Sequence, residues 1–223
     1  MSIVLRRGLL ALLAAFMPLF ASAAPAVPPH DVVKSATDQV LADLRANKKV
    51  YQNNSEALYQ SLNTILGPVI DVEGISRSIM TVRYSHQATP AQMKRFEENF
   101  KHSLINFYGN ALLEYNDQKI TVLPGSTQQG DDRASVAMEV VGKHGEIYPV
   151  SYTMVDINNH WMVRNVIVNG INLGKLYRDQ FQEAMRRNNE DLDKTIDNWG
   201  ASMADASKAA DEKINADKKA GAQ

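Results

Sequence analysis

The chain has 223 residues, with 24 lysines and arginines against 25 aspartates and glutamates, a length that suits one domain with a substantial core. The nearly balanced charge argues against a nucleic-acid-binding protein, which would carry a basic surface. The absence of cysteine excludes disulfides, thiolate metal sites, cysteine nucleophiles and a lipid anchor on an N-terminal cysteine.

The first segment, residues 1–23, is predicted to be a secretory signal peptide. Arg6 and Arg7 precede an apolar run from Gly8 to Phe20, and the small residues Ala21-Ser22-Ala23 follow it. The run is too short to span a membrane comfortably as a helix. We expect cleavage after Ala23, which removes two arginines, changes the net charge from −1 to −3 and leaves an exported, soluble chain.

Helical spacing of apolar residues predicts four helices in the first half of the chain. They cover Val32–Leu44, Ser55–Leu66, Val72–Val82 and Pro90–Leu113. The last has the strongest signal, because Thr89 is suited to the N-cap, Pro90 to the first helical position and Gln92 to the capping box. At 1.5 Å per residue it would be ~36 Å long.

The apolar pattern then changes to the spacing of strands. Four strands are predicted at Lys119–Leu123, Arg133–Val141, Glu146–Asp156 and Trp161–Asn169, with turn-rich connections between them, before two further helices at Gly174–Asn188 and Leu192–Trp199. Helices followed by consecutive strands indicate an α+β fold, in which helices cover one face of an antiparallel sheet of about four strands. Residues 200–223 are rich in Ala, Lys and Asp, and we expect a polar, flexible tail outside a domain at 24–199.

Catalytic and metal-binding motifs are absent from the sequence. The five histidines are not spaced as metal ligands, and Gly-x-Ser-x-Gly, His-Glu-x-x-His and phosphate-binding glycine loops are missing. Acidic pairs such as Glu97-Glu98 are typical of solvated surface. We therefore expect no enzyme activity, metal or cofactor.

Apolar residues on both faces of the predicted strands leave two interpretations open. Val150 and Tyr152 lie on one face of their strand, yet Ile147 and Val155 are apolar on the other. One interpretation is a sheet buried against helices. The other is an elongated apolar cavity between the twisted sheet and the helix Pro90–Leu113.

Three stretches of the sequence together carry a resemblance to a known family. They are Thr89-Pro90-x-Gln92-x-x-x-Phe96…Phe100, Tyr108-x-x-Ala111-Leu112-Leu113-x-Tyr115…Val122-Leu123-Pro124 and Trp161-x-Val163…Gly170…Tyr177-Arg178-x-Gln180-Phe181. In order and spacing, the chain resembles the MlaC/toluene-tolerance auxiliary family of periplasmic phospholipid-binding proteins over about residues 30–199. It departs from the family pattern at Asn165, where Asp is frequent, and at Asn172, where Ser is usual. If these positions fix a strand-to-helix junction, asparagine can still form the local hydrogen bonds.

The resemblance implies an NTF2-like twisted sheet packed against helices, with a small helical subdomain. It also implies a soluble periplasmic carrier that encloses acyl chains, leaves the head group largely outside and needs no cofactor. Its partners would be an outer-membrane lipoprotein–porin complex and an inner-membrane ABC transporter bearing MCE domains, in a pathway that maintains outer-membrane lipid asymmetry. We expect a monomer that binds no nucleic acid.

Candidate lipid-contacting residues follow from combining the resemblance with the apolar pattern. The predicted cavity wall comprises Met138, Val140, Val150, Tyr152, Met154 and Val166 on the sheet, Phe100, Leu104, Phe107 and Tyr108 on the long helix, and Ile75 and Ile79 at one end. Head-group candidates are Arg83, Lys143 and Arg164, with an ordinary surface role as the alternative for each. Arg178, in contrast, is interpreted first as a structural bracket.

Two other functions remain open at this level. One is a periplasmic NTF2-like hydrolase or isomerase, which would need a buried carboxylate or histidine at the cavity. The other is a chaperone or adaptor whose apolar groove binds peptide.

Overall fold

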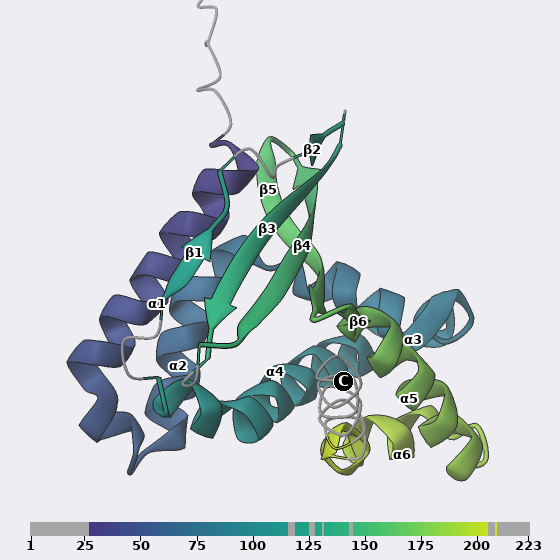
Figure 1. Ribbon diagram of the computed structural model, residues 1–223. Coiled ribbons are helices and arrows are strands. Elements are labelled where there is room, and N and C mark those ends of the chain that lie inside the picture. The colour runs from purple at the N-terminus through teal and green to yellow at the C-terminus, as the bar shows by residue number, and fades with distance from the viewer. Residues whose placement is uncertain are drawn as a thin grey trace, which may run out of the picture.

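The computed structural model describes residues 27–115, 119–124, 128–130, 132–142, 145–204 and 208 (Figure 1). The predicted signal peptide, the head-group candidate Lys143 and most of the C-terminal tail lie outside these residues. None of the helices within the described part is long and apolar enough to cross a membrane.

The element order confirms the α+β prediction. The helices are α1 (Pro29–Tyr51), α2 (Ser55–Leu66), the 3-10 turn η1 (Gly67–Val69), α3 (Val72–Gln87), α4 (Pro90–Leu113), α5 (Leu173–Arg187) and α6 (Leu192–Asp197). The strands are β1 (Ile120–Val122), β2 (Gln128–Gln129), β3 (Arg133–Val141), β4 (Ile147–Ile157), β5 (His160–Val168) and β6 (Ile171–Asn172). Each predicted helix and strand is present, while β2 and β6 are additional two-residue strands.

The strands form one antiparallel sheet in the order β1-β3-β4-β5-β6, with β2 also pairing with β3. The β4–β5 turn is made by Asn158 and Asn159, both with positive φ, as a tight two-residue hairpin requires. The register places Val140 opposite Tyr148 and Tyr152 opposite Val166. In Figure 1, α1 runs alongside the sheet next to β1, whereas α3, α5 and α6 gather on the opposite side, past β6.

A helical core stands apart from the sheet. Phe96 of α4, Phe181 of α5 and Trp199 are each fully buried and meet at ring-centroid distances between 5.2 and 5.9 Å. Ile79 and Met80 of α3 complete the same cluster. Separate clusters form between α1 and the sheet and among α1, α2 and α4. The aromatic packing therefore lies in the α3–α6 region, away from the face of the sheet that α1 covers.

The folded part extends beyond the predicted boundary at residue 199. Residues 199–204 are helical, and the Met203 side chain is fully buried in the α3–α6 core. The polar composition of the tail conceals this contact, because a single methionine among alanines gives little periodic signal.

Helix α3 continues to Gln87, past its predicted end, but breaks at Thr81, where φ is 63° and ψ is 165°. An interrupted helix leaves carbonyl groups without their usual partners. Arg178 of α5 donates from Nε to the Ser78 carbonyl and from Nη2 to the Ser78 hydroxyl, both at 3.1 Å. Arg178 thus joins α5 to the broken turn of α3, which confirms its structural role.

Candidate functional site

The larger cavity, called the first cavity below, has a volume of about 790 Å³ and lies between α1 and the sheet. Helix α1 contributes Val32, Val33, Ala36, Thr37, Val40, Leu41 and Leu44. The strands contribute Ile120, Met138, Val140, Val141, Tyr148, Tyr152, Val163 and Val166. The remaining lining residues are Leu66, Val69, Ile70, Leu112, Glu114, Tyr115, Gly142 and Glu146. Most of these side chains are apolar, as expected of a site for a hydrophobic ligand.

Helix α1 is fixed over the sheet by contacts at both ends of its apolar stripe. Near its start, Val33 packs against residues of the sheet in a shared cluster. Near its end, Asp43 accepts hydrogen bonds from the hydroxyls of Tyr51 at 2.8 Å and Ser61 at 2.7 Å, and from the Asn47 amide at 2.7 Å. Ser61 belongs to α2, so the Asp43 carboxylate ties the two helices together beside the cavity.

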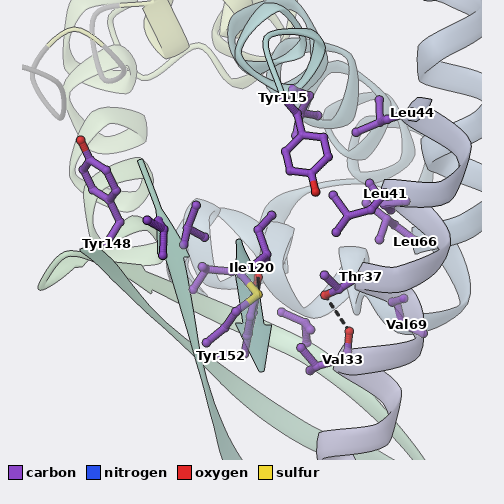
Figure 2. Close-up of a pocket in the computed structure, with 18 of the residues that line it drawn as sticks. Val33, Thr37, Leu41, Leu44, Leu66, Val69, Tyr115, Ile120, Tyr148 and Tyr152 are labelled. Atoms are coloured by element: carbon purple, nitrogen blue, oxygen red, sulfur yellow. Dashed lines mark hydrogen bonds between the residues drawn. The ribbon is translucent and has the colours of Figure 1, made fainter. Parts of the chain in front are cut away.

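The polar groups of the first cavity are tyrosines, one threonine and two glutamates. Figure 2 shows Tyr115 directing its hydroxyl toward the interior, whereas the Tyr148 hydroxyl points away from the other labelled side chains. Thr37 donates to the Val33 carbonyl at 2.8 Å and is satisfied within α1. Burial raises the pKa of Tyr152 to about 12, so this hydroxyl stays neutral inside the cavity.

A second cavity of about 220 Å³ adjoins the first. The two share Leu66, Ile70, Val163 and Val166 as lining residues. The other walls of the second cavity include Ile75, Phe100, Leu104, Leu173 and Tyr177. Burial raises the pKa of Tyr177, and its hydroxyl lies 3.2 Å from that of Tyr108. The second cavity is therefore also largely apolar, with the hydroxyl of its lining residue Tyr177 in contact with that of Tyr108.

An ion pair borders the second cavity. Arg164 of β5 lines it and pairs with Asp71, whose side chain is 10% exposed. Asp71 is also the N-cap of α3, since its carboxylate accepts the Gly74 N–H at 2.9 Å, and its own N–H donates to the Val163 carbonyl at 3.0 Å. These contacts fix the start of α3 against β5.

The two asparagines at which the chain departs from the family pattern both hold the junction between β5 and α5. Asn165 accepts the Gly174 N–H at 3.1 Å, and Asn172 caps α5 by accepting the Lys175 N–H at 2.9 Å. Asparagine at both positions therefore supplies the hydrogen bonds that the junction needs.

The structure distributes the predicted wall residues over three environments. Met138, Val140, Tyr152 and Val166 line the first cavity. Ile75, Phe100 and Leu104 line the second, as does Val166. Ile79 and Phe107 belong to the helical core, Tyr108 contacts Tyr177, and Val150 and Met154 are buried residues of β4, but none of these five lines either cavity.

The helix that faces the sheet across the first cavity is α1, and this corrects the expectation that Pro90–Leu113 forms that wall. Among the described side chains of α4, Leu112 alone lines the first cavity, while Phe100 and Leu104 line the second. The apolar stripe of α1 is visible in the sequence. Which helix crosses the sheet depends on tertiary packing, which helical periodicity does not encode.

The three head-group candidates lie in different parts of the chain's structure or outside its described residues. Arg83 lies in neither cavity lining and pairs with Glu190 at 3.3 Å, where its guanidinium also lies 4.9 Å from the Tyr84 ring centroid. Arg164 lines the second cavity, although Asp71 is its partner. Lys143 is outside the described residues, so Arg164 is the candidate placed at a cavity.

Acidic groups reach the rim of the first cavity, where Glu114 and Glu146 are lining residues. The Tyr148 hydroxyl donates to the Glu146 carboxylate at 3.1 Å. No histidine within the described part of the chain lines either cavity, and no cluster of metal-ligating side chains occurs there. Among the described residues, the cavity walls thus provide carboxylates without a histidine partner or a metal-binding group.

Comparisons with known proteins agree with this architecture. The sequence model of the MlaC protein family matches residues 34–201. The toluene tolerance protein ttg2D of Pseudomonas putida is 61% identical over 208 residues, which cover 93% of this chain and 95% of the relative. A phospholipid-binding protein from Ralstonia solanacearum, solved in complex with a phospholipid, superposes with a TM-score of 0.72 at 23% identity, covering 81% of this chain and 99% of that one. The last likeness shows a shared fold.

Proposed function

The chain belongs to the MlaC family, and from this premise we propose that it is a periplasmic carrier that encloses the acyl chains of a phospholipid. The first cavity is the observation that carries the proposal, since its wall is apolar and its volume of about 790 Å³ falls in the range of ligand pockets. The phospholipid complex of the Ralstonia solanacearum protein, which has the same fold, supports it.

The energetics of lipid transfer explain why an enclosed cavity is needed. Exposing a methylene group to water costs ~0.8 kcal/mol, so two chains of about 16 carbons would cost of order 25 kcal/mol. A cavity lined by valine, leucine and isoleucine removes most of that surface from water. Met138, Val140, Tyr152 and Val166 are the predicted wall residues that we assign to this contact.

A carrier role also requires partner complexes at the two membranes. We infer that the chain is exported, receives or delivers phospholipid at an outer-membrane lipoprotein–porin complex, and exchanges it with an inner-membrane ABC transporter bearing MCE domains. The predicted signal peptide and the net charge of −3 after its removal support a protein that crosses the periplasm without adhering to anionic membranes.

Mass spectrometry of the exported protein under denaturing conditions tests the proposal. Phospholipid should be released in a fixed ratio to protein. Val140→Glu places a carboxylate in the first cavity and should abolish that release, while the matched control Ile147→Glu, at a side chain that is 58% exposed, should retain it.

Folded protein that carries no phospholipid would contradict the carrier proposal. Displacement of bound material by unfolded outer-membrane protein, with no lipid co-purifying, would instead support a chaperone. Turnover of an ester substrate, abolished by Glu114→Gln or Glu146→Gln, would support a hydrolase.

A further inference from the structure

We propose that Arg45, held against the hydroxyl of Tyr115, binds the phosphate group of the enclosed phospholipid at the polar end of the first cavity. The assignment rests on the proposed carrier function, because it supposes that acyl chains occupy the apolar part of the same cavity. It places the head group at Arg45, which contacts the lining residue Tyr115, rather than at Arg83 or Arg164, neither of which lines the first cavity.

Along α1, a run of apolar side chains that line the cavity is followed by cationic side chains. From Val32 to Leu44 the helix lines the first cavity almost entirely with apolar groups. Arg45 follows this stripe directly, and Lys48 and Lys49 come within the next four residues; Arg45 and Lys48 are the two cations that reach the cavity wall. Twelve residues separate Val33 from Arg45, or ~18 Å along a helix at 1.5 Å per residue. One leaflet of a bilayer has a hydrocarbon depth of ~15 Å. An acyl chain that ends near Val33 would therefore bring its phosphate to the turn that holds Arg45.

Both cations are directed at one residue of the cavity wall, Tyr115. Arg45 Nη2 donates to the Tyr115 hydroxyl at 3.0 Å, and the guanidinium carbon lies 5.6 Å from the ring centroid. Lys48 Nζ donates to the Tyr115 carbonyl at 2.7 Å and so fixes the backbone of that residue. Tyr115 follows the C-terminus of α4 and directs its hydroxyl toward the interior of the cavity (Figure 2). The geometry brings a positive charge and a hydroxyl together at the end of the apolar stripe.

The chemistry of this pair suits a phosphodiester. A guanidinium carries five N–H donors in a planar fork, so one group can contact Tyr115 and a phosphate oxygen together. Charge-assisted hydrogen bonds of this kind are about twice as strong as neutral ones. A phosphate within reach of Arg45 at the end of the apolar stripe is therefore stabilised.

The test compares two lipids that share their acyl chains and differ in the phosphate. Delipidated full-length exported protein is offered equal amounts of phosphatidylglycerol and diacylglycerol in detergent, and the bound ratio is measured by native mass spectrometry. The variants are Arg45→Gln, Arg45→Lys and Tyr115→Phe. The matched control is Lys34→Gln, which makes the same charge change on α1 at an exposed ion pair with Asp38, outside the cavity lining.

We expect the wild-type protein to prefer phosphatidylglycerol and Arg45→Gln to reduce this preference roughly tenfold, with diacylglycerol uptake unchanged. Arg45→Lys should fall between the two, since it keeps the charge and loses the planar fork. Tyr115→Phe should reduce the ratio about threefold, and Lys34→Gln should match the wild type. An equal ratio in Arg45→Gln and the wild type would overturn the assignment. Where Arg45→Gln takes up neither lipid, Tyr115→Phe decides: a reduced ratio supports the assignment, and an unchanged ratio overturns it.

Two further outcomes distinguish the phosphate site from failure of the carrier proposal and from a site for soluble phosphate. A wild-type protein that takes up neither lipid would refute the carrier proposal itself, whereas equal uptake of both lipids by wild type and Arg45→Gln would refute only the phosphate site. Glycerol 3-phosphate offered alone distinguishes a lipid phosphate from a soluble one. We expect no binding at millimolar concentration, and binding that Arg45→Gln abolishes would reassign the site to a soluble phosphate.

Discussion

Replacing Gly74 by alanine should destabilise the protein, because the position has no room for a β-carbon. An added Cβ would lie 2.5 Å from Arg164 Nε and closer still to the carboxylate of Asp71. Neither side chain can move without loss, since Asp71 is the N-cap of α3 and the partner of Arg164. The substitution therefore forces the ion pair away from the start of α3.

The expected cost combines three contributions. Losing the N-cap costs about 1 kcal/mol. Separating the ion pair costs about 1 kcal/mol more, well below the value for a fully buried pair, because the Arg164 side chain is 37% exposed and solvent screens it. Alanine in a helix gains back up to about 1 kcal/mol over glycine. The net loss is about 1 to 2 kcal/mol.

Gly200→Ala is the matched control, because its added Cβ would meet only the Ser103 hydroxyl at 3.7 Å in a helical segment. It should be neutral or stabilising by up to about 1 kcal/mol. Urea unfolding of both variants should therefore place them about 2 kcal/mol apart. In an Asp71→Ala/Arg164→Ala background, the penalty at Gly74 should disappear. Equal stability of Gly74→Ala and Gly200→Ala in the wild-type background would refute the close contact.

Three more predictions concern the backbone of α3, the link between α1 and α2, and the end of the fold. Thr81 holds a φ of 63° and a ψ of 165°, a region that is almost exclusive to glycine, so Thr81→Gly should raise the thermal midpoint while Thr81→Ala should not. Burial pushes the pKa of Asp43 upward, but hydrogen bonds from Ser61, Tyr51 and Asn47 lower the pKa overall. Its contribution to stability is therefore present at neutral pH and lost as the pH falls through the lowered pKa, and Asp43→Asn should weaken the protein at pH 7 more than at pH 3 in urea titrations. A chain that stops after residue 198 loses the fully buried Trp199 and Met203 and should lose more than about 3 kcal/mol of unfolding free energy, whereas one that stops after residue 204 should match the full chain.

Local signals in the sequence locate the elements well where a side chain acts on its own backbone. At the start of α4, the Thr89 N–H donates to the Gln92 side chain at 2.9 Å, and the Gln92 N–H donates to the Thr89 hydroxyl at 3.2 Å, which confirms the predicted capping box. The strands β3, β4 and β5 likewise match their predicted ranges within a few residues. The two-residue strands β2 and β6 are too short for a period of two to be recognised.

The residues that line the cavities are harder to predict than the helices and strands, because whether a side chain lines a cavity depends on how those elements pack together. Val150 lies on β4 between the lining residues Tyr148 and Tyr152, with the same alternation, yet it is buried and lines neither cavity. Leu41 and Leu44 line the first cavity because α1 crosses the sheet, and their spacing alone is equally consistent with an ordinary core helix. For the same reason, the sequence does not identify Arg45 as a head-group candidate, because its partner Tyr115 is 70 residues away in sequence.

The aromatic core lies apart from the first cavity. This separation explains how the protein can stay folded around a large apolar space that its own side chains do not fill. A cavity forfeits the contacts that filling side chains would make, and it destabilises the fold in proportion to its volume. Here Phe96, Phe181 and Trp199 pack at the α3–α6 end, and none of them lines either cavity. The first cavity instead relies on α1, which Asp43 ties to α2 and Val33 to the sheet. Emptying the proposed lipid site would therefore leave the packing of the helical core unchanged.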